Sequence, residues 1–165
     1  MYTYHHFINK LKNILPSQFK VLVVDDDLDD QLLIEEAFKT GNMQCDLQFA
    51  SDGRQALSIL DKNSSYIPDL IVLDLNMPVM NGFEVLSQLQ VTSLFPRIPV
   101  VVLTTTAEAD YIDKSYDLGA KSFIVKPKSF RELETIANNL KQYWFKTVSL
   151  ARIPFKGYDT RRRTR

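Results

Sequence analysis

The chain contains the stretch Val21-Leu22-Val23-Val24-Asp25-Asp26-Asp27-Leu28-Asp29-Asp30, in which four apolar residues precede five acids among the next six residues. The apolar run is short, uninterrupted and mostly β-branched, which is typical of a strand buried on both faces. Carboxylates about 4 Å apart at the end of such a strand repel each other by roughly 1 kcal/mol in water and by roughly 4 kcal/mol at an effective dielectric constant near 20. A hard cation such as Mg²⁺ would relieve that repulsion, since the stretch offers only oxygen ligands. The alternative is a solvated loop before a helix N-terminus, where negative charge is favourable.

Composition limits the class of protein. A chain of 165 residues with 45% hydrophobic content can form one well-buried core, so we expect one domain. Its net charge of zero is unevenly distributed, because residues 146–165 carry seven basic residues and one acid. The rest is acidic, unlike a nucleic-acid-binding chain that is basic throughout. The single Cys45 excludes an internal disulfide, and the sequence has neither a membrane-spanning apolar stretch nor a signal-peptide pattern. We expect a cytoplasmic protein without membrane contact.

Strand and helix patterns alternate along the chain. The expected strands are Lys20–Val24, Asp46–Ala50, Leu70–Leu73, Val100–Leu103 and Ser122–Val125. The expected helix starts are Asp27 before Asp29–Phe38, Ser51 or Asp52 before Arg54–Leu60, Asn81 before Phe83–Leu89, and a capping box of Ser129 with Glu132. The last helix has an apolar stripe of Phe130, Leu133, Ile136, Ala137, Leu140 and Trp144. Five β/α units of this length predict an α/β fold, a doubly wound five-stranded parallel sheet with helices on both faces.

Polar residues follow four of the predicted strands. Asp25 and Asp26 follow the first strand, Asp74 the third, Thr104 the fourth and Lys126 the fifth. Taken singly, such residues are more often a turn residue, a strand former or a surface charge. Ligand sites in open α/β sheets, however, form at the carboxyl ends of the strands. Four strand ends with complementary groups therefore predict one site.

This set of groups suits phosphoryl transfer to a carboxylate. Aspartate can accept a phosphoryl group covalently, and such catalysis relies on positioning and on neutralising the charge of the phosphoryl oxygens. Mg²⁺ held by Asp26 and Asp74 would bind one oxygen, the Lys126 ammonium a second, and the Thr104 hydroxyl a third. The set contains no competent general base for an external substrate. We therefore predict a switch rather than an enzyme.

Four motifs resemble the signature of the receiver domain of two-component response regulators. They are Val23-Val24-Asp25-Asp26, the segment Asp69-Leu70-Ile71-Val72-Leu73-Asp74-Leu75-Asn76-Met77-Pro78-Val79-Met80-Asn81-Gly82, Leu103-Thr104, and Val125-Lys126-Pro127. The resemblance implies the flavodoxin-like strand order 2-1-3-4-5. It places a receiver domain at residues 19–147, between an N-terminal extension at 1–18 and a basic C-terminal extension at 148–165.

The resemblance also assigns roles to residues. It implies that Asp74 accepts phosphate from a histidine kinase or phosphotransfer protein, and that Thr104 and Lys126 contact the phosphoryl group. It implies a Mg²⁺ site made by Asp26, by Asp74, by the backbone carbonyl of Asn76 and, through water, by Asp25. Thr104 and Phe123 would form the switch, although many relatives carry Tyr in place of Phe123. Asn76 and Thr106 occupy positions that tune the lifetime of the phosphate, and the Lys126–Pro127 bond is expected to be cis.

The two ends of the chain carry further hypotheses. Apolar residues with helical spacing at Phe7, Ile8, Leu11, Ile14 and Leu15 predict a short amphipathic N-terminal helix. The segment Tyr143–Leu150 resembles the tail of single-domain regulators that accompany bacterial phytochromes, with Ala151 in place of their proline, and that tail helps to pair two receivers. Because Tyr143, Trp144 and Phe145 are consecutive, we expect a homodimer through the last strand, last helix and C-terminal extension. The alternative is that Trp144 completes the monomer core while the other two rings lie on the surface.

Two other classes of function compete with the receiver interpretation. A DNA-binding regulator could use the tail Arg161-Arg162-Arg163-Thr164-Arg165 to grip phosphates, but the chain contains no reading element, so a solubilising tail and no nucleic-acid contact are favoured. A hydrolase that works through an aspartyl-enzyme typically has a second Asp two residues after the nucleophile. Here Asn76 occupies that position.

Overall fold

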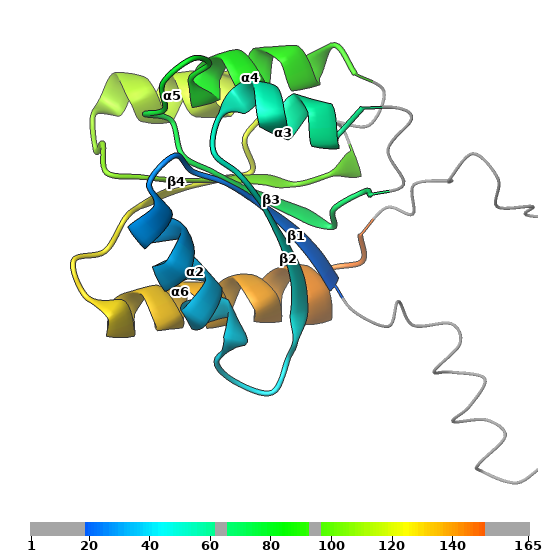
Figure 1. The fold of residues 1–165 in the computed structure, drawn as a ribbon, viewed down its shortest axis with the longest axis vertical. Helices are drawn as coiled ribbons and strands as arrows, with labels where there is room; N and C mark the ends of the chain where they lie inside the picture. The colour runs from blue at the N-terminus through cyan, green and yellow to red at the C-terminus, as the bar shows by residue number, and fades with distance from the viewer. Residues whose placement is uncertain (1–18, 62–65, 93–96, 151–165) are drawn as a thin grey trace, which may run out of the picture.

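The computed structural model describes residues 19–61, 66–92 and 97–150, which form one five-stranded parallel sheet with helices on both faces (Figure 1). The strands are β1 (Phe19–Val24), β2 (Cys45–Ala50), β3 (Leu70–Leu73), β4 (Val100–Thr104) and β5 (Ser122–Val125). The helices are α2 (Leu28–Lys39), α3 (Gly53–Ile59), α4 (Gly82–Gln90), α5 (Ala109–Asp117) and α6 (Phe130–Gln142), and α6 continues into a π-helical turn, η2 (Tyr143–Thr147). The strand order is β2-β1-β3-β4-β5, so the predicted fold class and strand order are confirmed.

Strand pairing brings the carboxyl ends of the strands to one edge of the sheet. Val24, the last residue of β1, pairs with Ala50 on one side and with Leu73 on the other. On the far side of β3, Thr104 of β4 pairs with Val125 of β5. The residues that follow these positions therefore lie close together at that edge, where parallel sheets of this kind form their ligand sites.

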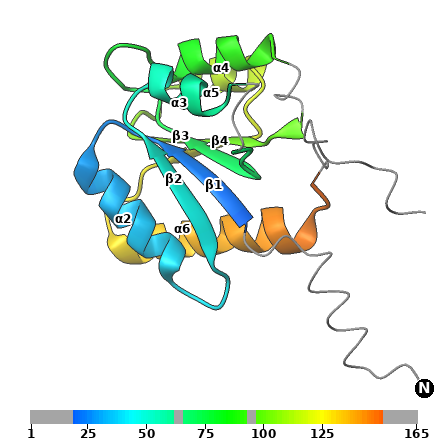
Figure 2. The same ribbon diagram turned by 45° about the vertical axis from the view of Figure 1, so that its right-hand side comes forward.

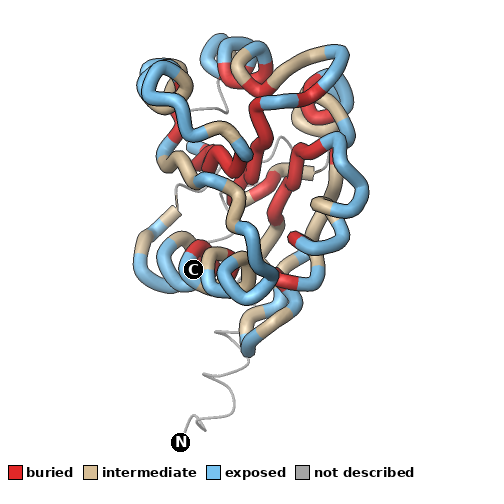
Figure 3. The backbone as a smooth tube through the Cα atoms, turned by 90° about the vertical axis from the view of Figure 1, so that its left-hand side faces the viewer, coloured by how far each residue is buried: buried red, intermediate tan, exposed pale blue. Residues whose placement is uncertain are grey.

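Two apolar clusters cover the sheet, one on each face. One cluster joins α3, α4 and α5 to strand residues such as Leu22, Ile71 and Val102. The other joins α2 and α6 to alternate strand residues such as Val23 and Val72. The two sets alternate because successive side chains of a strand point to opposite faces. Figure 2 shows α2 and α6 together on one face and α3, α4 and α5 on the other, while Figure 3 shows the buried residues concentrated between these layers.

Side-chain caps fix the starts of four helices. Asp27 accepts hydrogen bonds from the N–H groups of Asp29 and Asp30, Asp52 from that of Gln55, Asn81 from that of Glu84, and Ser129 from that of Glu132. The cap of α3 is therefore Asp52 and not Ser51. Asn81 and Glu84 form a complete, reciprocal capping box at α4. The observed bounds of α2, α3 and α4 differ from the predicted ones by one residue.

The three consecutive aromatic rings at the end of α6 lie in different environments. Phe145 is buried and stacks on Phe19, with ring centroids 4.2 Å apart and an interplanar angle of 9°. Trp144 is partly buried against the same cluster, whereas Tyr143 is 52% exposed and meets the Trp144 ring edge-on at 5.0 Å. The ring that completes the core is thus Phe145, and not Trp144 as the monomer alternative had it. The wider π-helical turn changes which side chain faces the sheet.

Some sequence hypotheses concern residues beyond those the structure describes. The amphipathic segment within residues 1–18 and the Arg-rich tail within residues 151–165 lie outside the described ranges, so the domain boundaries stay a prediction. None of the helices within residues 19–61, 66–92 and 97–150 combines the length and the apolar character that crossing a bilayer requires.

Candidate functional site

Three carboxylates converge at the carboxyl edge of the sheet. Asp25 follows β1 and Asp74 follows β3, and backbone hydrogen bonds fix both: the Asp25 N–H donates to the Ala50 carbonyl at 3.0 Å and the Asp74 N–H to the Val24 carbonyl at 2.9 Å. Oxygens of Asp25, Asp26 and Asp74 lie within 4.8 Å of one another. Asp25 and Asp74 are buried and Asp26 is exposed. The structure therefore brings the three predicted carboxylates together.

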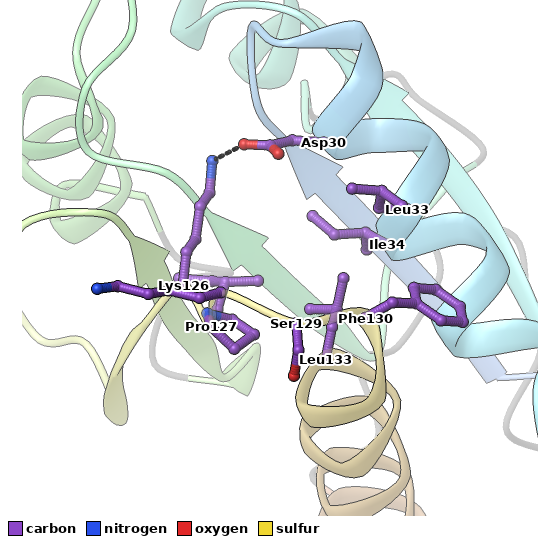
Figure 4. A pocket seen from close by; sticks show the side chains of 10 residues that line it. Asp30, Leu33, Ile34, Lys126, Pro127, Ser129, Phe130 and Leu133 are labelled. Carbon is purple, nitrogen blue, oxygen red and sulfur yellow. Dashed lines mark hydrogen bonds and ion pairs between the residues drawn. The ribbon is translucent and has the colours of Figure 1, made fainter.

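The ammonium group of Lys126 lies among the carboxylates. Its Nζ is 2.8 Å from Asp25 Oδ2 and 3.1 Å from Asp74 Oδ2. The backbone N–H of Lys126 donates to the Thr104 carbonyl at 2.7 Å, which fixes the residue at the end of β5. Its shortest ion pair, at 2.6 Å, is with Asp30 Oδ2 in the first turn of α2 (Figure 4).

The contact with Asp30 was not predicted from the sequence. Asp30 belongs to the acidic run that directed attention to Asp25 and Asp26, but it lies inside the following helix. A signal was present in its position, since a side chain in the first turn of a helix that leaves the carboxyl edge can point back toward that edge. The sequence alone did not indicate which of the acids in the run would do so.

Burial and ion pairing change the acidity of the central groups. Burial raises the pKa of Asp25 to about 6, and the opposing attraction of Lys126 only partly offsets this effect. For Lys126, burial acts to lower the pKa, but hydrogen bonds to Asp25 and Asp30 outweigh it and raise the pKa above its usual range. Lys126 therefore stays protonated, and Asp25 carries an unfavourable charge at neutral pH.

Thr104 and Asn76 form the side of the site that faces the loop after β4. Thr104 is buried at the end of β4. The Asn76 side-chain amide donates to Thr106 Oγ1 at 2.9 Å and lies 3.4 Å from Thr104 Oγ1, while its backbone N–H donates to Asp74 Oδ1 at 3.2 Å. Asn76 thus connects Asp74 to both threonines. The predicted role of its backbone carbonyl toward a metal stays a prediction.

The proposed switch residues lie on neighbouring strands. Phe123 pairs with Val102 in the register of β4 and β5, two positions before the pair of Thr104 with Val125. Since side chains two positions apart share a face of the sheet, Thr104 and Phe123 lie on the same face. Phe123 is partly buried against the apolar cluster of α3, α4 and α5. A change at Thr104 can therefore reach this ring along one face of the sheet.

The loop between β3 and α4 approaches the site closely. Gly82, the first residue of α4, donates its N–H to the Leu75 carbonyl at 3.0 Å. A Cβ atom at Gly82 would clash with the Asp74 carbonyl oxygen, so only glycine fits there. In the same loop Val79 has a φ of 67°, and the Met80 N–H donates to the Pro78 carbonyl at 2.7 Å, so this β-branched residue occupies a strained tight turn.

The Lys126–Pro127 peptide bond is trans, and the described residues contain no cis peptide bond. The sequence-based expectation of a cis bond is therefore wrong for this structure. The two forms of a bond before proline differ by only about 0.5–1 kcal/mol, so local packing decides between them.

The carboxylates of the site fit a hard divalent cation. Asp25, Asp26 and Asp74 offer oxygen donors only, and within the described ranges no His or Cys joins the group. Such donor sets suit Mg²⁺ and Mn²⁺ and disfavour softer metals. Asp25 and Asp74 are already buried, so a bound cation would offset a repulsion that exists in the folded chain.

Comparison with known proteins identifies the family. A family model described as the response regulator receiver domain matches residues 21–138. Response regulator Rcp1 of Synechocystis sp. is 34% identical over 134 residues, which are 79% of this chain and 91% of that protein. The crystal structure of the phosphorylated cyanobacterial phytochrome response regulator RcpA gives a TM-score of 0.76 at 33% identity, over 82% of this chain and 99% of that one. The Mn²⁺-bound form of Rcp1 gives a TM-score of 0.74 at 33% identity, over 81% and 99%. The chain belongs to the response regulator receiver family.

Proposed function

We propose that the chain is a phosphorylation-controlled switch in which Asp74 accepts a phosphoryl group from a histidine kinase or a phosphotransfer protein. One observation carries this proposal: Asp74 lies at the carboxyl edge of the sheet within one ion-paired group that contains Asp25 and Lys126, and Asn76 connects it to Thr104. Membership of the receiver family supports it. The output of the switch would be contact with another protein.

The proposed step forms one bond and breaks another. An Asp74 Oδ atom attacks the phosphorus of a phosphohistidine, the P–N bond breaks, and its electron pair stays on the histidine nitrogen, which takes up a proton. Charge on the three phosphoryl oxygens must be neutralised as they move. The Lys126 ammonium holds one oxygen and the Thr104 hydroxyl donates to another.

A Mg²⁺ ion would complete the neutralisation of the phosphoryl charge. Asp26, Asp74 and the Asn76 carbonyl would hold the ion directly and Asp25 through water. When bound, Mg²⁺ supplies positive charge to the phosphoryl group. This assignment is supported by the oxygen-only donor set and by the existence of a Mn²⁺-bound form of the similar Rcp1.

The response to phosphorylation would pass through Thr104 to Phe123. Thr104 turns its hydroxyl to the new phosphoryl oxygen, and the space that it leaves allows the Phe123 ring to move inward on the same face. Phe123 lacks the hydroxyl that a Tyr would carry, so its position depends on packing alone. The Asn76 side-chain amide donates hydrogen bonds to Thr104 and Thr106, and its bond to Thr104 would break as Thr104 moves.

We further propose that the phosphodonor docks on α2 and the start of α6. A donor histidine must approach Asp74 from the carboxyl edge, and a pocket there is lined by apolar side chains from both helices, including Leu33 and Phe130 (Figure 4). Leu28 and Leu32 on α2 are 67% and 59% exposed. The helix also begins with acidic residues. A partner surface that combines apolar and basic side chains would fit.

We place the proposed homodimer interface at the C-terminal end of α6, at η2 and at the last strand, β5, away from the start of α6 where the phosphodonor would dock. Tyr143 is 52% exposed and Trp144 is partly buried, so two aromatic rings are available at the end of α6, and Val125 at the end of the edge strand β5 is also exposed. Exposed aromatic side chains often supply much of the energy of an interface. A truncation after Gln142 would remove Phe145 from its stack on Phe19, so a point substitution is the cleaner test.

Sedimentation of Tyr143→Arg tests the dimer. We expect the wild-type chain to sediment as a dimer at micromolar concentration and this variant to sediment mainly as a monomer. Tyr116→Arg is a matched control, since Tyr116 is 49% exposed on α5. A monomeric wild-type chain, with or without phosphorylation, would contradict the dimer. A cytoplasmic location stays a prediction. The absence of nucleic-acid contact also stays a prediction, because the Arg-rich tail lies outside the described residues.

Phosphorylation itself is tested with a small acyl phosphate and Mg²⁺. Intact-protein mass spectrometry should show a gain of one phosphoryl group, and fragmentation should place it on Asp74. Asp74→Asn should abolish the gain, Asp26→Ala should weaken metal binding, and omission of Mg²⁺ should prevent labelling. Asp52→Asn, which keeps the cap of α3, is a control that should label normally. Phosphate on any other residue would refute the assignment.

A further inference from the structure

The Lys126 ammonium group has three carboxylate partners. An ammonium has three N–H donors, and the three distances of 2.6, 2.8 and 3.1 Å to Asp30, Asp25 and Asp74 lie in hydrogen-bonding range. The donors are therefore fully used before any phosphoryl group arrives. A phosphoryl oxygen on Asp74 can gain a strong contact with Lys126 only if one existing contact weakens.

The three partners differ in how easily they can be released. The side chains of Asp25 and Asp74 are 2% and 7% exposed and are fixed by backbone hydrogen bonds at strand ends. The Asp30 side chain is 35% exposed and belongs to a helix. A carboxylate loses less when it returns to water from a partly exposed position than when it stays buried without a cation. Asp30 is therefore the partner that Lys126 gives up most easily.

A phosphoryl group changes the balance of attraction at Lys126. It carries a charge of about −1.5 to −2 near neutral pH, more than the single charge of a carboxylate, and it offers three strong acceptor oxygens. It also brings like charge toward Asp30. Both effects draw the ammonium toward Asp74 and weaken its contact with Asp30.

We propose that Asp30 is a positioning residue that competes with the phosphoryl group on Asp74 for Lys126, so that phosphorylation releases the first turn of α2. The inference rests on the proposed function of Asp74. Asp30 and Lys126 line the pocket between α2 and α6 together with Leu33 and Phe130 (Figure 4). Release of Asp30 therefore reaches this pocket, on the face of the sheet opposite to Phe123. By reciprocity, a partner that draws Asp30 away from Lys126 promotes phosphorylation.

The first test compares two charge-matched variants. Asp29 and Asp30 are both acids of the first turn of α2, so Asp29→Asn and Asp30→Asn change the net charge and the helix-end electrostatics alike. The Asp30 carboxylate is 35% exposed, so we take its contribution to be on the order of 1 kcal/mol, which corresponds to roughly a fivefold change in rate. With acetyl phosphate at a Mg²⁺ concentration that saturates each variant, Asp30→Asn should label about three to five times faster than Asp29→Asn. Asp30→Glu, which keeps the carboxylate, should return most of the way to the wild-type rate.

The second test asks whether the effect depends on Lys126. In a Lys126→Met background, Asp30→Asn and Asp29→Asn should label at equal rates, because the contested ammonium is gone. Amide exchange supplies a readout of position: in the wild-type chain, phosphorylation should speed exchange in the first turn of α2, whereas Asp30→Asn should exchange fast there already without phosphate. Asp29→Asn should retain the wild-type response.

The outcomes separate this inference from the proposed function. Equal labelling rates for Asp30→Asn and Asp29→Asn, with phosphate still on Asp74, would overturn the competition and leave the phosphoacceptor assignment standing. An effect of Asp30→Asn that persists without Lys126 would also overturn it. Failure of the wild-type chain to label at Asp74 would overturn both.

Discussion

Two lysines that are largely shielded from solvent contact opposite ends of α2, and they differ in the kind of partner that they have. Lys126 lies at the first turn of the helix and pairs with carboxylates. Lys141, on α6, is 1% exposed and donates to the backbone carbonyls of Phe38, at 2.9 Å, and of Thr40, at the last turn. Burial lowers the pKa of Lys141, whereas the carboxylates raise that of Lys126 in spite of burial.

The comparison shows that the partner, more than the depth of burial, decides what a buried cation can do. Backbone carbonyls at a helix end cannot leave, so Lys141 fixes the last turn of α2 to α6. Carboxylates attract metal ions and compete with a phosphoryl group, so the contacts of Lys126 can be exchanged. The last turn of α2 therefore keeps its contacts with α6, whereas the contacts of its first turn can change when Asp74 is phosphorylated.

Removal of Lys126 should have the largest effect on stability, and that effect should depend on Mg²⁺. Lys126→Met leaves Asp25 and Asp74 buried without a cation, and loss of one partner of a buried ion pair typically destabilises by roughly 3 to 5 kcal/mol. Urea unfolding in EDTA should show this loss, and millimolar Mg²⁺ should restore most of it by neutralising the same carboxylates. If Mg²⁺ did not reduce the loss of stability in Lys126→Met, Lys126 would act as a fixed packing contact, as Lys141 does, and not as an exchangeable cation.

The acidity of Asp25 should give the next effect, with a sign opposite to that of most acids. Burial raises its pKa from an ordinary 3.8 to about 6, so between these values the folded chain binds a proton that the unfolded chain has lost. The contribution of Asp25 to stability is therefore favourable below about pH 4 and is lost as the pH rises through 6. A pKa raised from 3.8 to about 6 corresponds to roughly 3 kcal/mol.

Unfolding of the wild-type chain and of Asp25→Asn in EDTA at several pH values measures the pH-dependent contribution of Asp25 to stability. The difference in free energy of unfolding, wild type minus variant, should fall by roughly 3 kcal/mol between pH 4 and pH 7. At neutral pH the variant should be the more stable protein. A difference that does not change with pH would show that Lys126 already compensates the charge of Asp25 in full.

The sequence predicted the contacts that depend on strand ends. The apolar runs define where each strand stops, and a parallel sheet places those ends together, so Asp25, Asp74, Thr104 and Lys126 followed from local patterns and the ligand rule for such sheets. The strand order itself came from the family resemblance. The N-caps could also be predicted from the sequence, because a cap residue acts within four residues of the start of its own helix.

Two of the contacts that the sequence did not predict depend on how α2 packs. The pair of Lys126 with Asp30 joins residues 96 positions apart, and the bond from Lys141 to Phe38 spans 103 positions. A lysine in an amphipathic helix is normally solvated, so no local pattern marks Lys141 as buried. The Lys126–Pro127 bond was predicted wrongly because its two forms differ too little in energy for the local sequence to decide.

Replacement of Lys141 should destabilise the chain by about 2 kcal/mol, independently of Mg²⁺. Lys141→Met preserves most of the side-chain volume but leaves the carbonyls of Phe38 and Thr40 without donors, and hydrogen bonds to charged groups contribute about 1.5 to 3 kcal/mol. Lys39→Met is the control, since Lys39 is more than half exposed and pairs with Glu35 and Glu36 of its own helix. Urea unfolding with and without Mg²⁺ should show little or no loss of stability for that control. If Mg²⁺ restored the stability of Lys141→Met, the two lysines would not differ in their dependence on the metal ion, and the distinction between them would be wrong.

The smallest effect is expected at the cap that fixes the responsive end of α2. Asp27 accepts hydrogen bonds from the Asp29 and Asp30 N–H groups at 2.8 and 3.2 Å, so Asp27→Ala should destabilise by about 1 kcal/mol and Asp27→Asn by much less, since Asn also caps. Because the cap holds the turn that carries Asp30, Asp27→Ala should also speed amide exchange there, while exchange at the last turn, held by Lys141, should not change. Hydrogen exchange of both variants without phosphate measures the two ends separately. If Asp27→Ala loosened both ends equally, α2 would open as one unit and its first turn could not respond alone.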